Sequence, residues 1–240
     1  MKEEKIKYKI KLASTFVSEG KNLHAIQIYK QLINLNDSEE VYYLLAELYE
    51  NMGFVDSAIS LLDQLHSASP ENNDISLYFG QFLLRNSKWF EAIQVLDNIK
   101  QSSSYVLYLI AYSYMMINEY ELSREYFNDY LESNDNDELK LKAHLYLAKI
   151  EYELKNYDKA LDFVTKAQFV YSDLWELNLT SAKIYYSLKM YNHALTAIQN
   201  ALKTNSNDAG VQEFAGKIFY ALEDFEKSEM HFSKAIELSS

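Results

Sequence analysis

Residues 39–70 read EEVYYLLAELYENMGFVDSAISLLDQLHSASP. The first half carries apolar side chains at i, i+3, i+4 and i+7, the spacing of one face of an α-helix, at Tyr42, Leu45, Ala46 and Tyr49. The second half has the matching pattern at Ala58, Leu62 and Leu65. Gly53 can adopt the left-handed backbone that ends a helix, and Pro70 stops the second helix. The stretch therefore predicts a hairpin of two packed helices.

The same register returns along the whole chain, with a small residue at the eighth and at the twentieth position of each of seven units. The eighth positions are Ala13, Ala46, Gly80, Ala111, Ala148, Ala182 and Gly216, and the twentieth are Ala25, Ala58, Ala92, Ser123, Ala160, Ala194 and Ser228. Subtracting successive twentieth positions gives spacings of 33, 34, 31, 37, 34 and 34 residues. Helices that cross at about 8 to 10 Å leave no room for larger side chains, so we expect these fourteen residues at the crossings.

A period near 34 residues with small residues at these two positions resembles the tetratricopeptide-repeat family. The resemblance implies an all-α protein, a right-handed superhelical solenoid of seven antiparallel helix pairs that forms a single domain over residues 1–240. The expected repeats are 6–38, 39–72, 73–103, 104–138, 141–174, 175–208 and 209–240. The fifth repeat departs from the pattern, because Glu151 stands where the family has a buried tyrosine, and we expect Tyr152 to cover the gap.

Composition excludes several classes of protein. The chain has no cysteine, so it can form neither a disulfide nor a thiolate metal site. It lacks the apolar runs of a signal peptide or a membrane span, which predicts a cytoplasmic protein. A net charge of −12 repels phosphate backbones and anionic lipids, so we expect no nucleic-acid partner.

Residues that could carry catalysis are scattered. The five histidines, His24, His66, His144, His193 and His231, include no pair at i, i+4. The sequence also lacks a glycine-rich phosphate loop and a Gly-x-Ser-x-Gly nucleophile motif. We therefore expect no enzymatic activity, no metal site and no cofactor.

The resemblance implies that the first helix of each repeat lines a concave groove through its second, fifth, ninth, twelfth and thirteenth positions. Tyrosines gather at these positions, and we expect ligand contact at Tyr108, Tyr112, Tyr152, Tyr186 and Tyr220; Tyr43 and Tyr105 occupy such positions too. The alternative is that these rings pack against the next hairpin. The ninth positions of the last three repeats are Lys149, Lys183 and Lys217, a file of cations suited to an acidic segment. Alternatively, these lysines pair with carboxylates such as Glu176 or Glu213.

The chain is thus predicted to be a non-enzymatic scaffold that binds a peptide or protein segment in its groove. A second expectation concerns the last helix, residues 225–238, whose apolar stripe a capping helix would normally cover. The stripe comprises Phe232, Ala235, Ile236 and Leu238. Either the chain is a fragment of a larger tetratricopeptide-repeat protein, or this helix is covered by self-association or a partner, or its end is frayed. Self-association through the uncapped helix would make the chain a structural assembly module.

Overall fold

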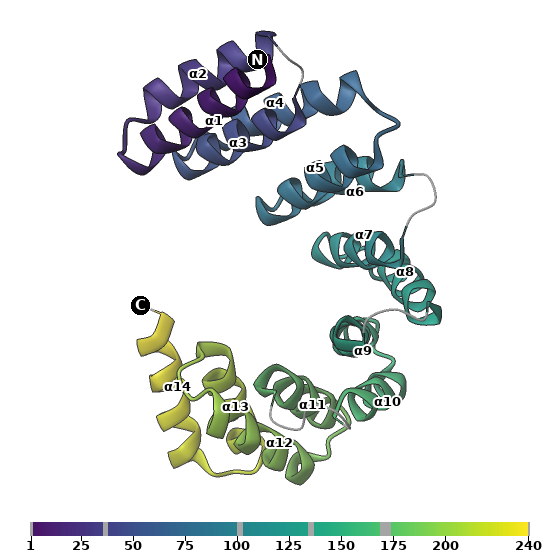
Figure 1. Ribbon diagram of the computed structural model, residues 1–240. Coiled ribbons are helices and arrows are strands. Elements are labelled where there is room, and N and C mark those ends of the chain that lie inside the picture. The colour runs from purple at the N-terminus through teal and green to yellow at the C-terminus, as the bar shows by residue number, and fades with distance from the viewer. Residues whose placement is uncertain (1, 36–37, 100–102, 134–136, 169–173, 240) are drawn as a thin grey trace. The chain divides into compact units, whose positions relative to one another are not determined.

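The computed structural model describes residues 2–35, 38–99, 103–133, 137–168 and 174–239. Over these ranges the chain forms fourteen α-helices and no strand (Figure 1). The predicted all-α fold class is confirmed. None of the helices in these ranges is long and apolar enough to cross a membrane.

The chain consists of two compact units, Met1–Ile117 and Asn118–Ser240. The helices of the first unit are α1 (Lys2–Ser18), α2 (Asn22–Leu35), α3 (Glu39–Asn51), α4 (Val55–Ala68), α5 (Asn73–Arg85), α6 (Trp89–Asp97) and α7 (Ser104–Met116). Those of the second unit are α8 (Tyr120–Glu132), α9 (Asp137–Glu153), α10 (Tyr157–Gln168), α11 (Trp175–Ser187), α12 (Tyr191–Thr204), α13 (Ala209–Ala221) and α14 (Phe225–Ser239). That all repeats form one domain stays a prediction.

Consecutive helices pack as hairpins, and each hairpin packs on the next one in its unit. In the first unit the hairpins are α1–α2, α3–α4 and α5–α6, with α2 against α3, α4 against α5 and α6 against α7. In the second unit they are α9–α10, α11–α12 and α13–α14, with α8 against α9, α10 against α11 and α12 against α13. Each internal helix therefore buries one face in its own hairpin and another in the neighbouring one.

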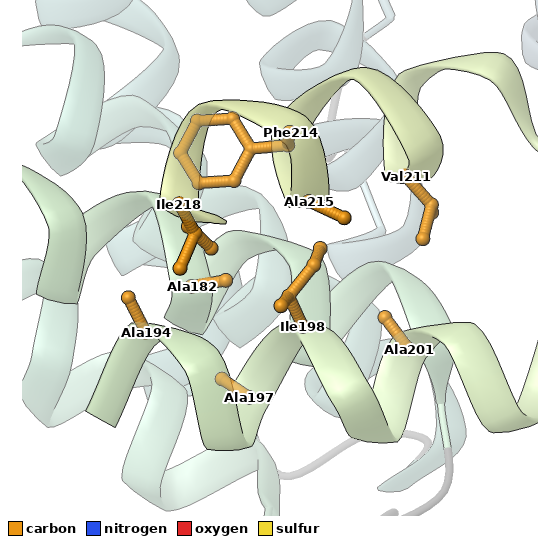
Figure 2. Close-up of a cluster of buried hydrophobic side chains, with 9 residues drawn as sticks. All are labelled: Ala182, Ala194, Ala197, Ile198, Ala201, Val211, Phe214, Ala215 and Ile218. Atoms are coloured by element: carbon orange, nitrogen blue, oxygen red, sulfur yellow. The ribbon is translucent and has the colours of Figure 1, made fainter. Parts of the chain in front are cut away.

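The fourteen small residues of the repeated register are all buried. At Gly80 an added Cβ would lie 2.4 Å from Leu96 Cδ2, and at Gly216 it would lie 2.9 Å from Phe232 Cδ1. The buried Ser228 hydroxyl donates a hydrogen bond to the Gly216 carbonyl over 3.0 Å. The paired helices therefore approach until side chains touch backbone. Figure 2 shows similar close packing between α12 and α13, where the small side chains of Ala194, Ala197 and Ala201 of α12 lie beneath the residues of α13.

The turn inside each hairpin contains one residue with a left-handed backbone, φ between 59° and 79°, at Gly20, Gly53, Ser87, Asn118, Lys155, Lys189 and Glu223. At Gly53 the flanking amides close the helix end: Gly53 N–H donates to Glu50 O over 2.9 Å, and Phe54 N–H donates to Tyr49 O over 2.8 Å. The prediction that Gly53 ends its helix in this conformation is confirmed. Five of these turns hold the conformation without glycine, which costs such residues about 1 to 2 kcal/mol each.

Lys189→Gly should therefore raise the free energy of unfolding by up to about 1 kcal/mol, since glycine removes the strain but adds entropy to the unfolded chain. Gly53→Ala should lower it by about 1 kcal/mol, through backbone strain alone, because an added Cβ meets no atom within 4 Å there. Urea denaturation of the full chain measures both changes. Lys203→Gly, inside α12, is the matched control and should destabilise by about 1 kcal/mol. A loss of similar size for Lys189→Gly would contradict the prediction.

Candidate functional site

Three helices of the second unit, α9, α11 and α13, present a lysine and a tyrosine one turn apart. We call these six residues the tyrosine–lysine surface: Lys149, Tyr152, Lys183, Tyr186, Lys217 and Tyr220. The i, i+3 spacing places both side chains of a helix on the same face. Because α9 contacts α11 and α11 contacts α13, the pairs are neighbours in a row.

The three lysines of this surface differ in their surroundings. Burial lowers the pKa of Lys149, the nearby charge of Glu176 raises it, and the charge of Lys183 lowers it further, with a net decrease. Lys217 forms an ion pair with Glu213 one turn earlier on α13, and both side chains are about half exposed. Such an exposed pair contributes under about 1 kcal/mol.

Lys183, half-buried at the centre of the row, forms no hydrogen bond or ion pair with any residue in the described ranges. The alternative of pairing with Glu213 therefore applies to Lys217, and Glu176 stands near Lys149. The middle lysine keeps its ammonium group available to a ligand.

The three tyrosines each pack against an aromatic residue five positions later, across the hairpin turn. The ring centroids are 5.8 Å apart for Tyr152–Tyr157, 5.4 Å for Tyr186–Tyr191 and 5.5 Å for Tyr220–Phe225. Tyr186 also contacts Phe214 of the next hairpin edge-on, at 5.5 Å, as the packing alternative anticipated. Tyr220 is 62% exposed. These contacts hold the rings in place, so they offer fixed apolar plates with a polar hydroxyl.

The two remaining tyrosine candidates lie on α7, in the first unit. Tyr108 is buried, and its ring lies 6.5 Å from that of Tyr105. Tyr112 packs edge-on against Trp89 at 5.8 Å. Ligand contact at Tyr108 and Tyr112 stays a prediction, separate from the tyrosine–lysine surface of the second unit.

In the first unit, α3 and α5 are joined by an ion pair that the repeat pattern did not predict. Arg85 binds Glu50 with both sides of its guanidinium: Nε lies 2.9 Å from Oε1 and Nη2 lies 2.7 Å from Oε2. Asn86 Nδ2 donates a third hydrogen bond to Oε1 over 2.6 Å. Partial burial alone would raise the pKa of Glu50, but these hydrogen bonds and the Arg85 charge outweigh it and lower the pKa.

Beside this ion pair, two tyrosines stack between the same helices. The Tyr43 and Tyr78 ring centroids are 3.9 Å apart, and the Tyr78 hydroxyl donates to Glu47 over 3.2 Å. Burial and neighbouring carboxylates raise the pKa of each tyrosine to about 12. The members of both pairs, Tyr43–Tyr78 and Glu50–Arg85, are 35 residues apart, which is one repeat plus one residue. Complementary residues at this spacing were the sequence signal that could have predicted these contacts. On this face of the first unit, the charged groups thus pair with one another and the tyrosine rings stack on one another.

Two family models match the sequence. The model "Tetratricopeptide repeat" matches residues 108–172, and the model "Anaphase-promoting complex, cyclosome, subunit 3" matches residues 51–130. A search of curated proteins found no significant match.

Several solved structures resemble the chain. A tetratricopeptide repeat protein from Parabacteroides merdae is 17% identical, with a TM-score of 0.73 over 99% of this chain and 94% of that one. YrrB, described as a protein of this repeat class with an unusual peptide-binding site, is 16% identical, with a TM-score of 0.56 over 74% and 91%. A chain from the APC/C hetero-tetramer Cut9-Hcn1 is 15% identical, with a TM-score of 0.63 over 91% of this chain and 43% of that one. These likenesses confirm the predicted solenoid of helix pairs.

The Glu50–Arg85 ion pair should make stability depend on pH. Because folding lowers the pKa of Glu50, its contribution is complete above the unfolded value, about 4.3, and is lost as the pH falls through the folded value. Glu50→Gln should therefore cost about 0.5 to 1 kcal/mol at pH 7 and almost nothing in strong acid. Urea denaturation between pH 7 and pH 3 measures this, with the exposed Glu40→Gln on the same helix as control. A cost that stays constant with pH would contradict the assignment.

Proposed function

We propose that this chain, which belongs to the tetratricopeptide-repeat family, is a non-enzymatic scaffold that binds a segment of another protein on its tyrosine–lysine surface. Proteins of this family generally mediate protein–protein interactions, and one structural neighbour is described by its peptide-binding site. The single observation that carries the proposal is Lys183, a half-buried ammonium group with no partner among the described residues, between two helices that repeat its pattern. The cytoplasmic location expected from the sequence belongs to the same proposal.

The chemistry of the surface favours an acidic segment with apolar side chains beside its carboxylates. A carboxylate at Lys183 would gain a charge-assisted hydrogen bond, the stronger kind of polar contact. It would also neutralise the repulsion between Lys183 and Lys149. The fixed rings of Tyr152, Tyr186 and Tyr220 supply flat apolar area next to each ammonium group. Binding of this kind depends on where the lysines lie and not on the net charge of the chain. The net charge of −12 only slows the approach of an acidic partner.

Lys183→Glu and Tyr186→Ala should each weaken partner binding at least about tenfold, the loss expected from one charge-assisted contact or one aromatic anchor. Partners are captured from an extract of the native cells with the full chain as bait, identified, and then titrated against each variant by calorimetry. The triple reversal Lys149→Glu, Lys183→Glu, Lys217→Glu should abolish binding.

Lys203→Glu, an exposed reversal on α12, is the charge-matched control and should bind like the wild type. Circular dichroism confirms that every variant keeps its helix content. Equal affinity of Lys183→Glu, Tyr186→Ala and wild type for every captured protein would overturn the proposal.

A second candidate, self-association, is favoured by the exposed apolar side chains of α14. Ile236 is 70% exposed and Met230 is 57% exposed. Ile236 is 34 residues after Leu202, which packs into the cluster formed with α13. On α14 the equivalent side chain is exposed, and a helix of a second copy could pack on it as α13 packs on Leu202. Light scattering over a hundredfold range of concentration should show a rising mass for the wild type and a constant mass for Ile236→Glu. A wild type that is monomeric throughout would exclude this function.

A further inference from the structure

Glu151 is a buried carboxylate at a position where the repeat otherwise places a large apolar side chain. It occupies the eleventh position of its repeat, on α9, and only 2% of its surface is exposed. The corresponding residues of the other six repeats are Phe16, Tyr49, Leu83, Tyr114, Tyr185 and Phe219. Burying a carboxylate in place of a ring is costly unless its oxygens find hydrogen-bond donors.

One side of the Glu151 carboxylate is firmly held. Asn156 Nδ2 donates to Glu151 Oε2 over 2.8 Å, and the Asn156 amide N–H donates to the Glu151 backbone carbonyl over 2.8 Å. Tyr152 packs against Tyr157 and against the core cluster between α9 and α10, and that it covers the gap left by the missing tyrosine stays a prediction. The carboxylate is therefore held in position by Asn156.

Glu151 also lines a cavity of about 500 Å³ between α8 and α10. The cavity is lined by Arg124, Asn128, Glu151, Asp158, Lys159, Asp162 and Phe163. The cation nearest to Oε1 is Arg124 Nη1 at 3.8 Å, which is too long for a hydrogen bond. No residue of the described ranges donates a hydrogen bond to Oε1. Glu151 Oε1 therefore has a loose ion pair with Arg124 but no hydrogen bond from the described residues, so it can still accept one from a ligand or from water.

Clefts of the same kind occur in the first unit, but their floors are apolar. The cleft on α3, between α2 and α4, has Leu45 and Tyr49 at its base. The cleft on α5, between α4 and α6, has Phe79 and Leu83. Of these three clefts, only the one on α9 has a carboxylate at the eleventh repeat position. Burying that charge costs stability, and function is one reason for which proteins bear such a cost.

We propose that this cleft binds a primary ammonium group at the end of an alkyl chain. The ammonium group donates to Glu151 Oε1, and the alkyl chain lies against Phe163. Asp158 adds a second carboxylate at the rim, while Asp162 is already paired with Lys166 at 2.8 Å. Lysine side chains of a partner protein and free alkylamines share this chemistry, and the experiment below separates them.

The cavity is lined by three carboxylates, Glu151, Asp158 and Asp162, and by two cations, Arg124 and Lys159, a balance that favours a cation over an anion. Glu151 has a short side chain that Asn156 holds in place, so an anion in the cavity would be repelled by a group that cannot move away. Arg124 is 30% exposed and reaches the site through a long flexible side chain, so it can turn outward when a ligand cation arrives. The net charge of −12 also concentrates cations near the surface.

The test uses the full chain and three probes at low ionic strength. Two carry an ammonium group: n-butylammonium chloride, and a peptide with one lysine whose two ends are chemically blocked so that they carry no charge. The third, N-butylacetamide, is the neutral analogue. Calorimetry or chemical-shift titration should show saturable binding of the two ammonium probes and none of the neutral analogue. Binding of both identifies the shared ammonium chemistry, and binding of the peptide alone identifies a protein lysine as the source. Glu151→Gln, which keeps the shape but removes the charge, should weaken binding at least about tenfold.

A second variant separates a binding role from a packing defect. Glu151→Tyr introduces the residue that three of the other repeats have at this position, so it should abolish ammonium binding and raise the melting temperature by about 2 to 4 °C or more. Lys203→Gln, an exposed change on α12, should leave ammonium binding unchanged. The probes report on Glu151 and not on partner capture by the tyrosine–lysine surface, so failure of one proposal can be distinguished from failure of the other. Failure of the wild type to bind either ammonium probe, or equal binding by Glu151→Gln, would overturn the proposal and leave water as the occupant.

Discussion

The close approach of paired helices at small side chains is the constraint on which the structure depends. Alanine, glycine or serine stands at both crossing positions of every repeat, and all of these residues are buried. With Leu96 2.4 Å from a Cβ built at Gly80, no further atom fits without a shift. Because each hairpin closes in this way, its outer faces are left to pack on the neighbouring hairpins, and the same residue positions recur at the same places in each unit.

Repetition makes the exceptions informative. On the first unit, the Arg85 guanidinium, the Glu50 carboxylate and the stacked tyrosines satisfy one another between α3 and α5. Among the described residues of the second unit, Lys183 has no such partner, and Glu151 Oε1 has only a 3.8 Å ion pair with Arg124 and no hydrogen bond. Binding requires groups that folding leaves unsatisfied, so we place both proposed sites there. The two sites share α9, which carries Lys149 and Tyr152 of one and Glu151 of the other, and they call for ligands of opposite charge.

The fold was predictable because the same steric requirement, a small residue where paired helices cross, applies in every repeat. Ala46 and Ala58 occupy the eighth and twentieth positions of one repeat, and Ala182 and Ala194 occupy the same positions of another. The left-handed turns at Lys155 and Lys189 were not predictable in this way, since neither residue favours that backbone and only the closing of the hairpin imposes it. The Glu50–Arg85 pair was missed because it depends on how far neighbouring hairpins are staggered. The lysine row was visible, but which lysine lacks a partner depends on side-chain positions that spacing does not determine.

The most direct test of the central claim is a substitution scan of the full chain at the fourteen crossing positions, with folded protein measured for every amino acid at each. The account predicts that only alanine, glycine, serine and cysteine retain folding at most of these positions, because overpacking a crossing costs about 1 to 3 kcal/mol or more. Exposed positions of the same helices, such as Glu40 and Thr196, should accept most residues. If leucine or phenylalanine were tolerated at the crossings as often as at the exposed positions, close helix approach would not be what organises this protein.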